Sequence, residues 1–212
     1  LDHSQLSLMK LMGLLLGDAA TAELEAALKT EPGLTVNLLR MTNSVGAGCM
    51  EKITSLGHAI TVLGRRQLQR WLQLLVFASG SQNGTSNPLL LMAATRGRLM
   101  ELLAAESRPG DAALADQAFM TGIMSLMPAL VGQPIADIVA PLGLTGDIRD
   151  ALCAGSGTLG ALLRIAESSE DGDMLRLTQA LAELPGLGPK AINRAQTQAL
   201  QWANDIGREK QP

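Results

Sequence analysis

The sequence predicts an all-α protein, a bundle of many helices. Strand signals are nearly absent, because the 212 residues include no tyrosine and only two phenylalanines, and no run alternates apolar with polar residues. Apolar residues recur instead at helical spacing along most of the chain. They make up 47% of the sequence, which is enough for a sizeable core.

Five apolar stripes predict helices in the first third of the chain. We interpret 1–17 as an N-terminal helix that links to an upstream domain, because the sequence starts at Leu1 rather than Met. Thr21 is expected to cap the second helix, and Asn43 is a natural terminator for the third. Ser55 is expected to cap the fourth helix. The stripes run over 8–15, 24–28, 34–42, 56–63 and 68–75.

The stretch SGSQNGTSNP at 79–88 has the composition of a linker. We expect it to lie inside one helical domain that spans 18–212. Pro134 and Pro189 suit the first turn of a helix, where the missing N–H is not needed. The remaining helices are expected over 88–106, 111–131, 134–141, 146–153, 158–168, 174–183 and 189–207.

Composition limits the partners of the chain. Charged residues make up 17%, against roughly 25% in soluble domains, so either a partner covers some of the surface or the protein is a compact, leucine-rich bundle. The net charge of −3 and the lack of a basic arm disfavour general nucleic-acid affinity. Cys49 and Cys153 read as isolated reduced thiols of a cytosolic protein. No uninterrupted apolar run approaches the ~18 residues of a membrane span, so we expect a cytoplasmic protein without a membrane partner.

Three short motifs are tempting, and each has a plainer interpretation. GSGTLG (155–160) fits the glycine pattern of dinucleotide sites, but a helix rather than a strand precedes it, which favours a helix–turn–helix junction. LPGLGPKA (184–191) is similar to a DNA-binding helix-hairpin-helix, but a plain turn before a Pro-started helix explains the same residues and is the favoured interpretation. ESSEDGD (167–173) lacks the EF-hand order of ligands and is expected to be a solvated acidic loop.

Catalytic constellations are not indicated by the residue types present. The chain has two histidines, His3 and His58, and neither is followed by an aspartate. A metal hydrolase site needs more imidazole and carboxylate ligands at matched spacings. We therefore predict no catalytic residues, no bound metal and no cofactor.

A family resemblance then emerges from a run of motifs. Leu38-Leu39-Arg40, Asn43-Ser44, Ile53-Thr54-Ser55-Leu56, Ala59-Ile60 and Leu63-Gly64 resemble the HDOD domain. The following residues are similar to the HDOD half of EAL–HDOD proteins of the cyclic di-GMP phosphodiesterase type: Gly64-Arg65, Leu68, Arg70-Trp71-Leu72, Leu75, Arg96, Glu101-Leu102, Phe119-Met120-Thr121-Gly122, Ser125-Leu126, Leu142-Gly143-Leu144 and Gly157-Thr158-Leu159-Gly160.

This resemblance implies an HD-like helical bundle without the metal ligands of HD phosphohydrolases. It implies a non-catalytic signalling module that contacts an upstream EAL-type domain, a protein partner or another copy of itself. Two alternatives stay open: a DNA-binding module using 184–194, and a degenerate HD-type metal phosphohydrolase. A weaker one is a nucleotide receptor that uses Arg40 and Asn43.

The candidate interaction or ligand site follows the motif residues. Asn43 and Ser55 fit helix capping as well as ligand contact, and Trp71 also fits the core because it lies within a helical stripe. A cationic ridge is expected beside the site, although exposed arginines are usually solvated. The site comprises Arg40, Asn43, Ser44, Ser55 and Trp71, and the ridge comprises Arg65, Arg66 and Arg70.

Overall fold

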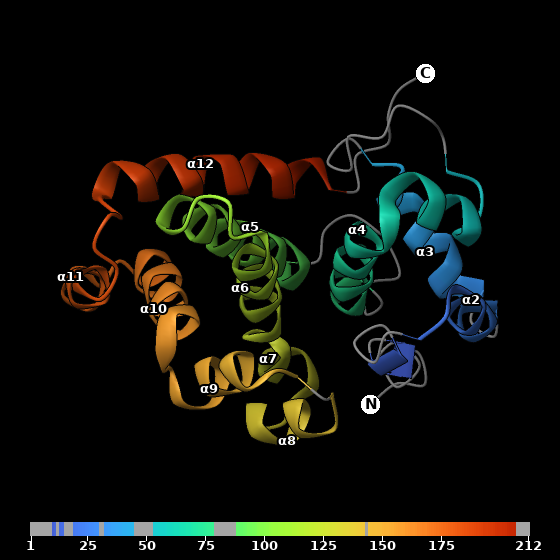
Figure 1. Ribbon diagram of the computed structural model, residues 1–212, viewed down its shortest axis with the longest axis horizontal. Coiled ribbons are helices and arrows are strands. Elements are labelled where there is room, and N and C mark those ends of the chain that lie inside the picture. Colours follow the sequence, from blue (N-terminus) through green and yellow to red (C-terminus); the bar gives the residue numbers. More distant parts are fainter. Residues whose placement is uncertain are drawn as a thin grey trace. The chain divides into compact units, whose positions relative to one another are not determined.

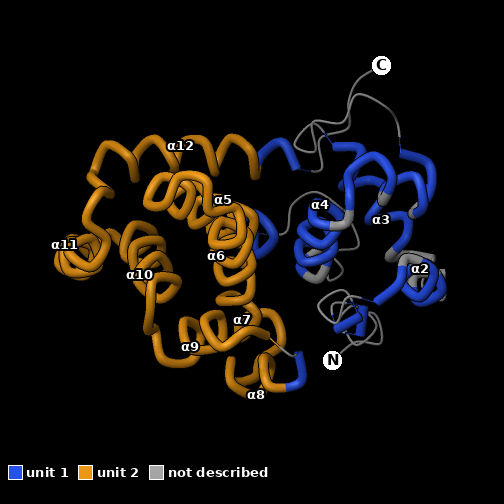
Figure 2. The backbone as a smooth tube through the Cα atoms, in the orientation of Figure 1, with its two compact units in different colours: residues 1–91, 141–143, 204–212 blue, residues 92–140, 144–203 orange. Residues whose placement is uncertain are grey.

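The computed structural model confirms the all-α prediction (Figure 1). It describes residues 10, 11, 13, 14, 19–29, 32–44, 53–78, 88–142 and 144–206. Every element formed by these residues is a helix. They fall into two compact units, coloured separately in Figure 2. Unit 1 holds residues 1–91, 141–143 and 204–212, and unit 2 holds 92–140 and 144–203.

Unit 1 is built on three helices that contact one another: α2 (Thr21–Lys29), α3 (Pro32–Thr42) and α4 (Leu56–Ala78). Thr21 is the first residue of α2 rather than its cap. The backbone N–H of Ala20 donates to Glu23 Oε2 at 3.3 Å, so a glutamate in the first turn of α2 accepts the N–H of the residue just before the helix. The large side chains buried in this unit include Leu11, Leu24, Leu38, Ile53, Leu68, Trp71, Leu72, Leu74, Leu75 and Phe77.

Helix α4 consists of two helical segments separated by a kink. Gly64 has φ 74° and ψ 161°, a backbone conformation open to glycine and strained for other residues. The two apolar stripes predicted over 56–63 and 68–75 therefore correspond to the two sides of this kink. Most of the predicted N-terminal helix, and residues 79–87 of the predicted linker, lie outside the described residues.

Unit 2 contains most of α5 (Pro88–Ser107) and then α6 (Ala112–Met124), α7 (Met127–Val131) and α8 (Ile135–Val139). A 3-10 turn, η2 (Ala140–Leu142), follows α8, and its last two residues are assigned to unit 1. The last four helices are α9 (Gly146–Ala154), α10 (Gly157–Asp171), α11 (Met174–Ala182) and α12 (Pro189–Asp205). Helix α10 has contacts with α6, α9 and α11.

The single helix predicted over 111–131 is wrong in one respect, since the chain breaks between α6 and α7. The N–H of Leu126 bonds to Ile123 O instead of continuing the α-helical pattern. Pro128 follows in the first turn of α7, where its ring and missing N–H prevent a bond back into α6.

Helices α5 and α6 approach closely at two glycines. A Cβ on Gly122 would lie 2.8 Å from Gly97 Cα and 2.9 Å from Arg96 O. A Cβ on Gly97 would lie 2.8 Å from Ile123 Cγ1. The two backbones therefore touch where a larger residue would separate them, and this contact sets the position of Arg96 relative to α6.

Helix α12 is anchored by small residues and one aromatic side chain. It buries Ala191, Ala195, Ala199 and Ala203 at intervals of four along one face. Trp202 packs edge-on against Phe119, with ring centroids 6.0 Å apart and planes at 77°. The Arg98 guanidinium lies 5.8 Å from the Trp202 ring centroid, within cation–π range.

One segment of unit 2 is long and apolar enough to cross a membrane by length and composition. A window that tolerates isolated polar residues, unlike the uninterrupted run considered above, selects 112–131 with a mean hydropathy of 1.3. In the structure, 61% of this window is buried inside the protein. This is also the behaviour of a helix in the core of a soluble protein.

Candidate functional site

The Asn43 side chain joins the end of α3 to the residues just before α4, and we call this arrangement the Asn43 clamp. Through its amide nitrogen, Asn43 donates to Leu39 O at 2.8 Å and to Ile53 O at 2.7 Å. Its amide oxygen accepts the N–H of Ile53 at 2.7 Å. The side chain therefore ends α3 and also pairs with the backbone just before α4, as a strand partner would.

Ser55 begins α4 as the sequence predicts. Its Oγ accepts the N–H of His58 at 3.1 Å, the bond of an N-cap residue to the third residue of the helix. His58 Nδ1 accepts the N–H of Thr54 at 3.4 Å in return. The pair resembles a capping box in which a histidine replaces the usual glutamate.

The other predicted site residues differ in exposure. Ser44 is fully buried next to the Asn43 clamp, and its Oγ is a buried hydroxyl with no hydrogen-bond partner among the described residues. Trp71 is fully buried in the unit 1 core. Arg40 is exposed in the last turn of α3. The clamp thus places Asn43 and Ser44 next to residues 53–55, while Trp71 belongs to the core; a ligand or partner role for this set stays a prediction.

The predicted cationic ridge is only partly described. Arg66 is exposed and Arg70 is half-buried on α4. The side chain of Arg65 lies outside the described residues. A joint role for the three arginines therefore stays a prediction.

The GSGTLG motif is a junction between helices, as predicted. Gly155 ends α9 in the left-handed conformation, with φ 63°, and α10 begins at Gly157. A Cβ on Gly160 would lie 2.3 Å from the carbonyl carbon of Gly155, so only glycine fits there. Arg164 fixes the junction by donating to Gly155 O and to both carboxylate oxygens of Glu183.

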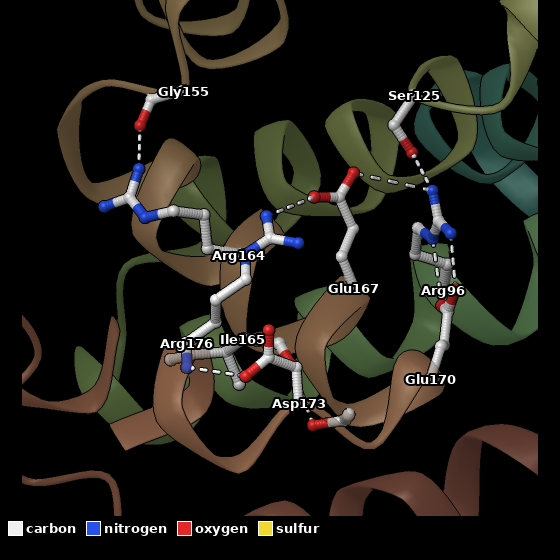
Figure 3. Close-up of polar contacts among 10 residues, drawn as sticks. Arg96, Ser125, Gly155, Arg164, Ile165, Glu167, Glu170, Asp173 and Arg176 are labelled. Carbon is white, nitrogen blue, oxygen red and sulfur yellow. Dashed lines mark hydrogen bonds and ion pairs between the residues drawn. The ribbon is translucent and has the colours of Figure 1, made fainter. Parts of the chain in front are cut away.

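The acidic stretch 167–173 is not a solvated loop, which corrects that expectation. Glu167 and Glu170 lie in α10 and reach a buried arginine, Arg96 of α5 (Figure 3). Asp173 caps α11 by accepting the N–H groups of Leu175 and Arg176 at 3.1 and 3.0 Å. Three of the four carboxylates of this stretch thus form a helix cap or ion pairs within unit 2, and the fourth, Asp171, is exposed.

The Arg96 cluster joins four helices of unit 2. Arg96 binds Glu170 through two nitrogens, with Nε 2.9 Å from Oε1, and donates to Ser125 Oγ at 2.8 Å. Glu167 lies between Arg96, at 4.0 Å, and Arg176, at 3.8 Å, as Figure 3 shows. Ser125 in turn donates to Gly122 O at 2.7 Å. The cluster thus ties α5 and α10 to the ends of α6 and α11.

Sequence reasoning missed the ionic role of this cluster. Arg96 was noted only as part of a family motif. The available signal was a lone arginine beside a glycine in the otherwise apolar run PLLLMAATRG at 88–97. Such an arginine is rarely buried unless a carboxylate pairs with it.

The LPGLGPKA segment forms the turn between α11 and α12. Gly186 has φ 120°, and α12 starts at Pro189 as predicted. Arg194, one of the two cations expected to help a DNA contact, forms an ion pair with Glu106. Lys190 is exposed.

A metal centre of the HD hydrolase kind does not fit the described residues. Among them, no group of three or more His, Cys, Asp or Glu side chains is placed to hold an ion. His58 directs Nδ1 to the Thr54 backbone, and Ala59 stands next to it in the chain.

The fold is that of an HD-like helical bundle. A crystal structure of a candidate phosphohydrolase from Shewanella amazonensis SB2B matches with a TM-score of 0.58, covering 94% of this chain and 93% of that one. The sequence identity of this pair is 14%, so the match shows the fold alone.

Within that fold class, the sequence defines the family. The model of the HDOD domain matches residues 7–134, more than half of the chain. The chain belongs to the HDOD family, as the motifs in residues 38–64 indicate.

Two curated relatives resemble most of the chain. The cyclic di-GMP phosphodiesterase CdgJ of Vibrio cholerae is 29% identical over 175 residues, and the uncharacterised protein YuxH of Bacillus subtilis is 27% identical over 177 residues. Each match covers 82% of this chain. The chain spans only 40% of CdgJ and 41% of YuxH.

Proposed function

We propose that this chain is a non-catalytic HDOD regulatory module of cyclic di-GMP signalling that works by contacting a neighbouring domain or a partner protein. Family membership and the similarity to CdgJ support the signalling part. Because the similarity covers about two fifths of CdgJ, we place the phosphodiester chemistry in an EAL-type domain of the same longer protein. The cytoplasm is the compartment in which such a module would act.

The observation that carries the non-catalytic part is how the family-motif side chains are used. The Asn43 side-chain amide forms three hydrogen bonds to backbone atoms of unit 1. Ser55 and His58 cap the start of α4. The hydrogen-bonding groups of Asn43 and Ser55 are thereby committed to the backbone, so these two residues support a structural scaffold better than a reaction centre.

Exposed apolar side chains support a contact role. Met174 and Leu175, at the start of α11, are 68% and 71% exposed. Large apolar side chains at this exposure are natural anchors for a partner surface, particularly on a chain with 17% charged residues. Val36 of α3 offers a similar contact in unit 1.

The test uses this chain together with the EAL domain of its full-length protein. Calorimetry should detect their association, and the rate of cyclic di-GMP hydrolysis by the EAL domain should change when this chain is added. Leu175→Ser should weaken the association, whereas Gln179→Ser, an exposed change on the same helix, should not. Cyclic di-GMP hydrolysis by this chain alone, with Mg²⁺ or Mn²⁺ present, would contradict the non-catalytic assignment, and failure to associate would contradict the contact role.

A further inference from the structure

Unit 2 contains a cavity of about 500 Å³ that is open to solvent and whose charged lining residues Arg108, Asp147 and Asp150 are exposed. It lies between the turn after α5, the start of α6, helix α9 and the start of α10. Its volume falls in the range of about 300–1,000 Å³ typical of small-molecule sites. Leu114 and Leu159, both buried, contribute apolar surface to it.

One side of the cavity offers hydrogen-bond donors. The Arg108 guanidinium donates to Thr158 Oγ1 at 3.2 Å, and both residues line the cavity. Ser156 precedes α10 without capping it, because its hydroxyl bonds to Asp150 O at 3.4 Å. In the described part of the chain, the first N–H groups of α10 therefore have no side-chain acceptor. A guanidinium beside uncapped N–H groups suits a carboxylate.

Helix α9 contributes negatively charged acceptors to the cavity. Asp147 and Asp150 lie one turn apart on this helix, and both line the cavity. Both aspartates are exposed, and the described residues provide no hydrogen-bond or ion-pair partner for either carboxylate. The third acidic residue of the lining, Asp111, is already used, since it accepts the N–H of Leu114 at 2.9 Å as the cap of α6. Two unpaired carboxylates suit an ammonium or guanidinium group.

The wall that carries the donors is held in one shape. Gly160 packs so tightly on the Gly155 backbone that the turn before α10 has no room to shift toward it. Arg164, one turn further along α10, donates to the same Gly155 carbonyl, as Figure 3 shows. A preformed wall reduces the ordering cost of binding.

We propose that this cavity binds a basic amino acid, with its carboxylate at Arg108 and the α10 N–H groups and its cationic groups at Asp147 and Asp150. A ligand that carries both a carboxylate and cationic groups can contact both charged sides of the cavity at once. One arginine against three carboxylates favours a ligand with net positive charge. This site is independent of the proposed contact role, since it uses neither Met174 nor Leu175.

Isothermal titration with L-arginine tests the proposal. We expect one saturable site on the intact chain, agmatine binding about tenfold more weakly because it lacks the carboxylate, and no saturable binding of L-glutamate. Asp147→Asn and Asp150→Asn should each weaken L-arginine about tenfold. Arg108→Gln should weaken L-arginine and leave agmatine unchanged, a difference that general destabilisation would not produce.

Asp137→Asn is the matched control, because Asp137 is exposed on α8 and does not line the cavity. It should bind L-arginine like the unmodified chain, and thermal unfolding should confirm that all variants are folded. Absence of saturable L-arginine binding up to about 10 mM would overturn the proposal. So would equal affinity for agmatine, or Asp147 and Asp150 variants that behave like the control.

Discussion

Removing the carboxylate that pairs with Arg96 should destabilise unit 2 substantially. The Arg96 side chain is 9% exposed and that of Glu170 is 28% exposed, so Glu170→Ala leaves a guanidinium with little access to water. Breaking a fully buried pair in this way costs about 3–5 kcal/mol. Ser125 and Glu167 remain near Arg96 and offset part of that loss. We therefore expect Glu170→Ala to lower the free energy of unfolding by about 2–3 kcal/mol.

The reverse truncation should be milder, which makes a double-mutant cycle informative. Arg96→Met leaves Glu170, which is exposed enough to be hydrated, and should cost about 1–2 kcal/mol. Because each single change removes the same pair, the double variant should be less destabilised than the sum of the two by at least about 1 kcal/mol.

Urea unfolding, monitored by ¹⁹F NMR of fluorotryptophan-labelled protein, measures the loss of stability separately in unit 1 and in unit 2. The chain has two tryptophans. Trp202 lies in unit 2 and Trp71 in unit 1, so each unit has its own resonance. The Trp202 transition should move to lower urea in Glu170→Ala. A shift worth less than about 0.5 kcal/mol, or strict additivity in the cycle, would refute the view that Arg96 depends on Glu170.

Two further predictions concern the backbone contacts of the fold. Asn43→Ala removes three hydrogen bonds and should cost about 2–3 kcal/mol in urea unfolding; Asn43→Asp keeps the acceptor for the Ile53 N–H but sets a carboxylate oxygen against the Leu39 and Ile53 carbonyls, so it should also destabilise the protein, and a loss below about 0.5 kcal/mol in both variants would contradict the clamp. Gly122→Ala places a methyl group 2.8 Å from Gly97 Cα and should cost about 1–3 kcal/mol by thermal unfolding, whereas Gly146→Ala, with nothing within 4 Å of its added Cβ, should be tolerated.

The sequence predicted local features well because their causes are local. The cap at Ser55, the terminator Asn43 and the junction at 155–160 each depend on residues a few positions away, and the structure confirms all three as structural features. The break between α6 and α7 was missed because an apolar run continues across it, although Pro128 was visible.

The long-range features were not accessible in the same way. Arg96 and Glu170 are separated by 74 positions, and no pattern in a single sequence links an arginine in α5 to a carboxylate in α10. The stretch 167–173 therefore reads as a polar loop when its neighbours are unknown. The Asn43 clamp was predicted only in part. Helix termination predicts its bond to Leu39, four residues away, but not its two bonds to Ile53, ten residues away.

The alanines of α12 raise the question of what prevents this helix from sliding along its own axis. Methyl groups repeated every fourth residue look alike from one turn to the next, so a slide by a full turn would leave much the same face against unit 2. Trp202 breaks that equivalence, since its indole meets Phe119 and Arg98 at only one longitudinal setting. The Trp202 indole therefore fixes the axial position of α12 against the rest of unit 2.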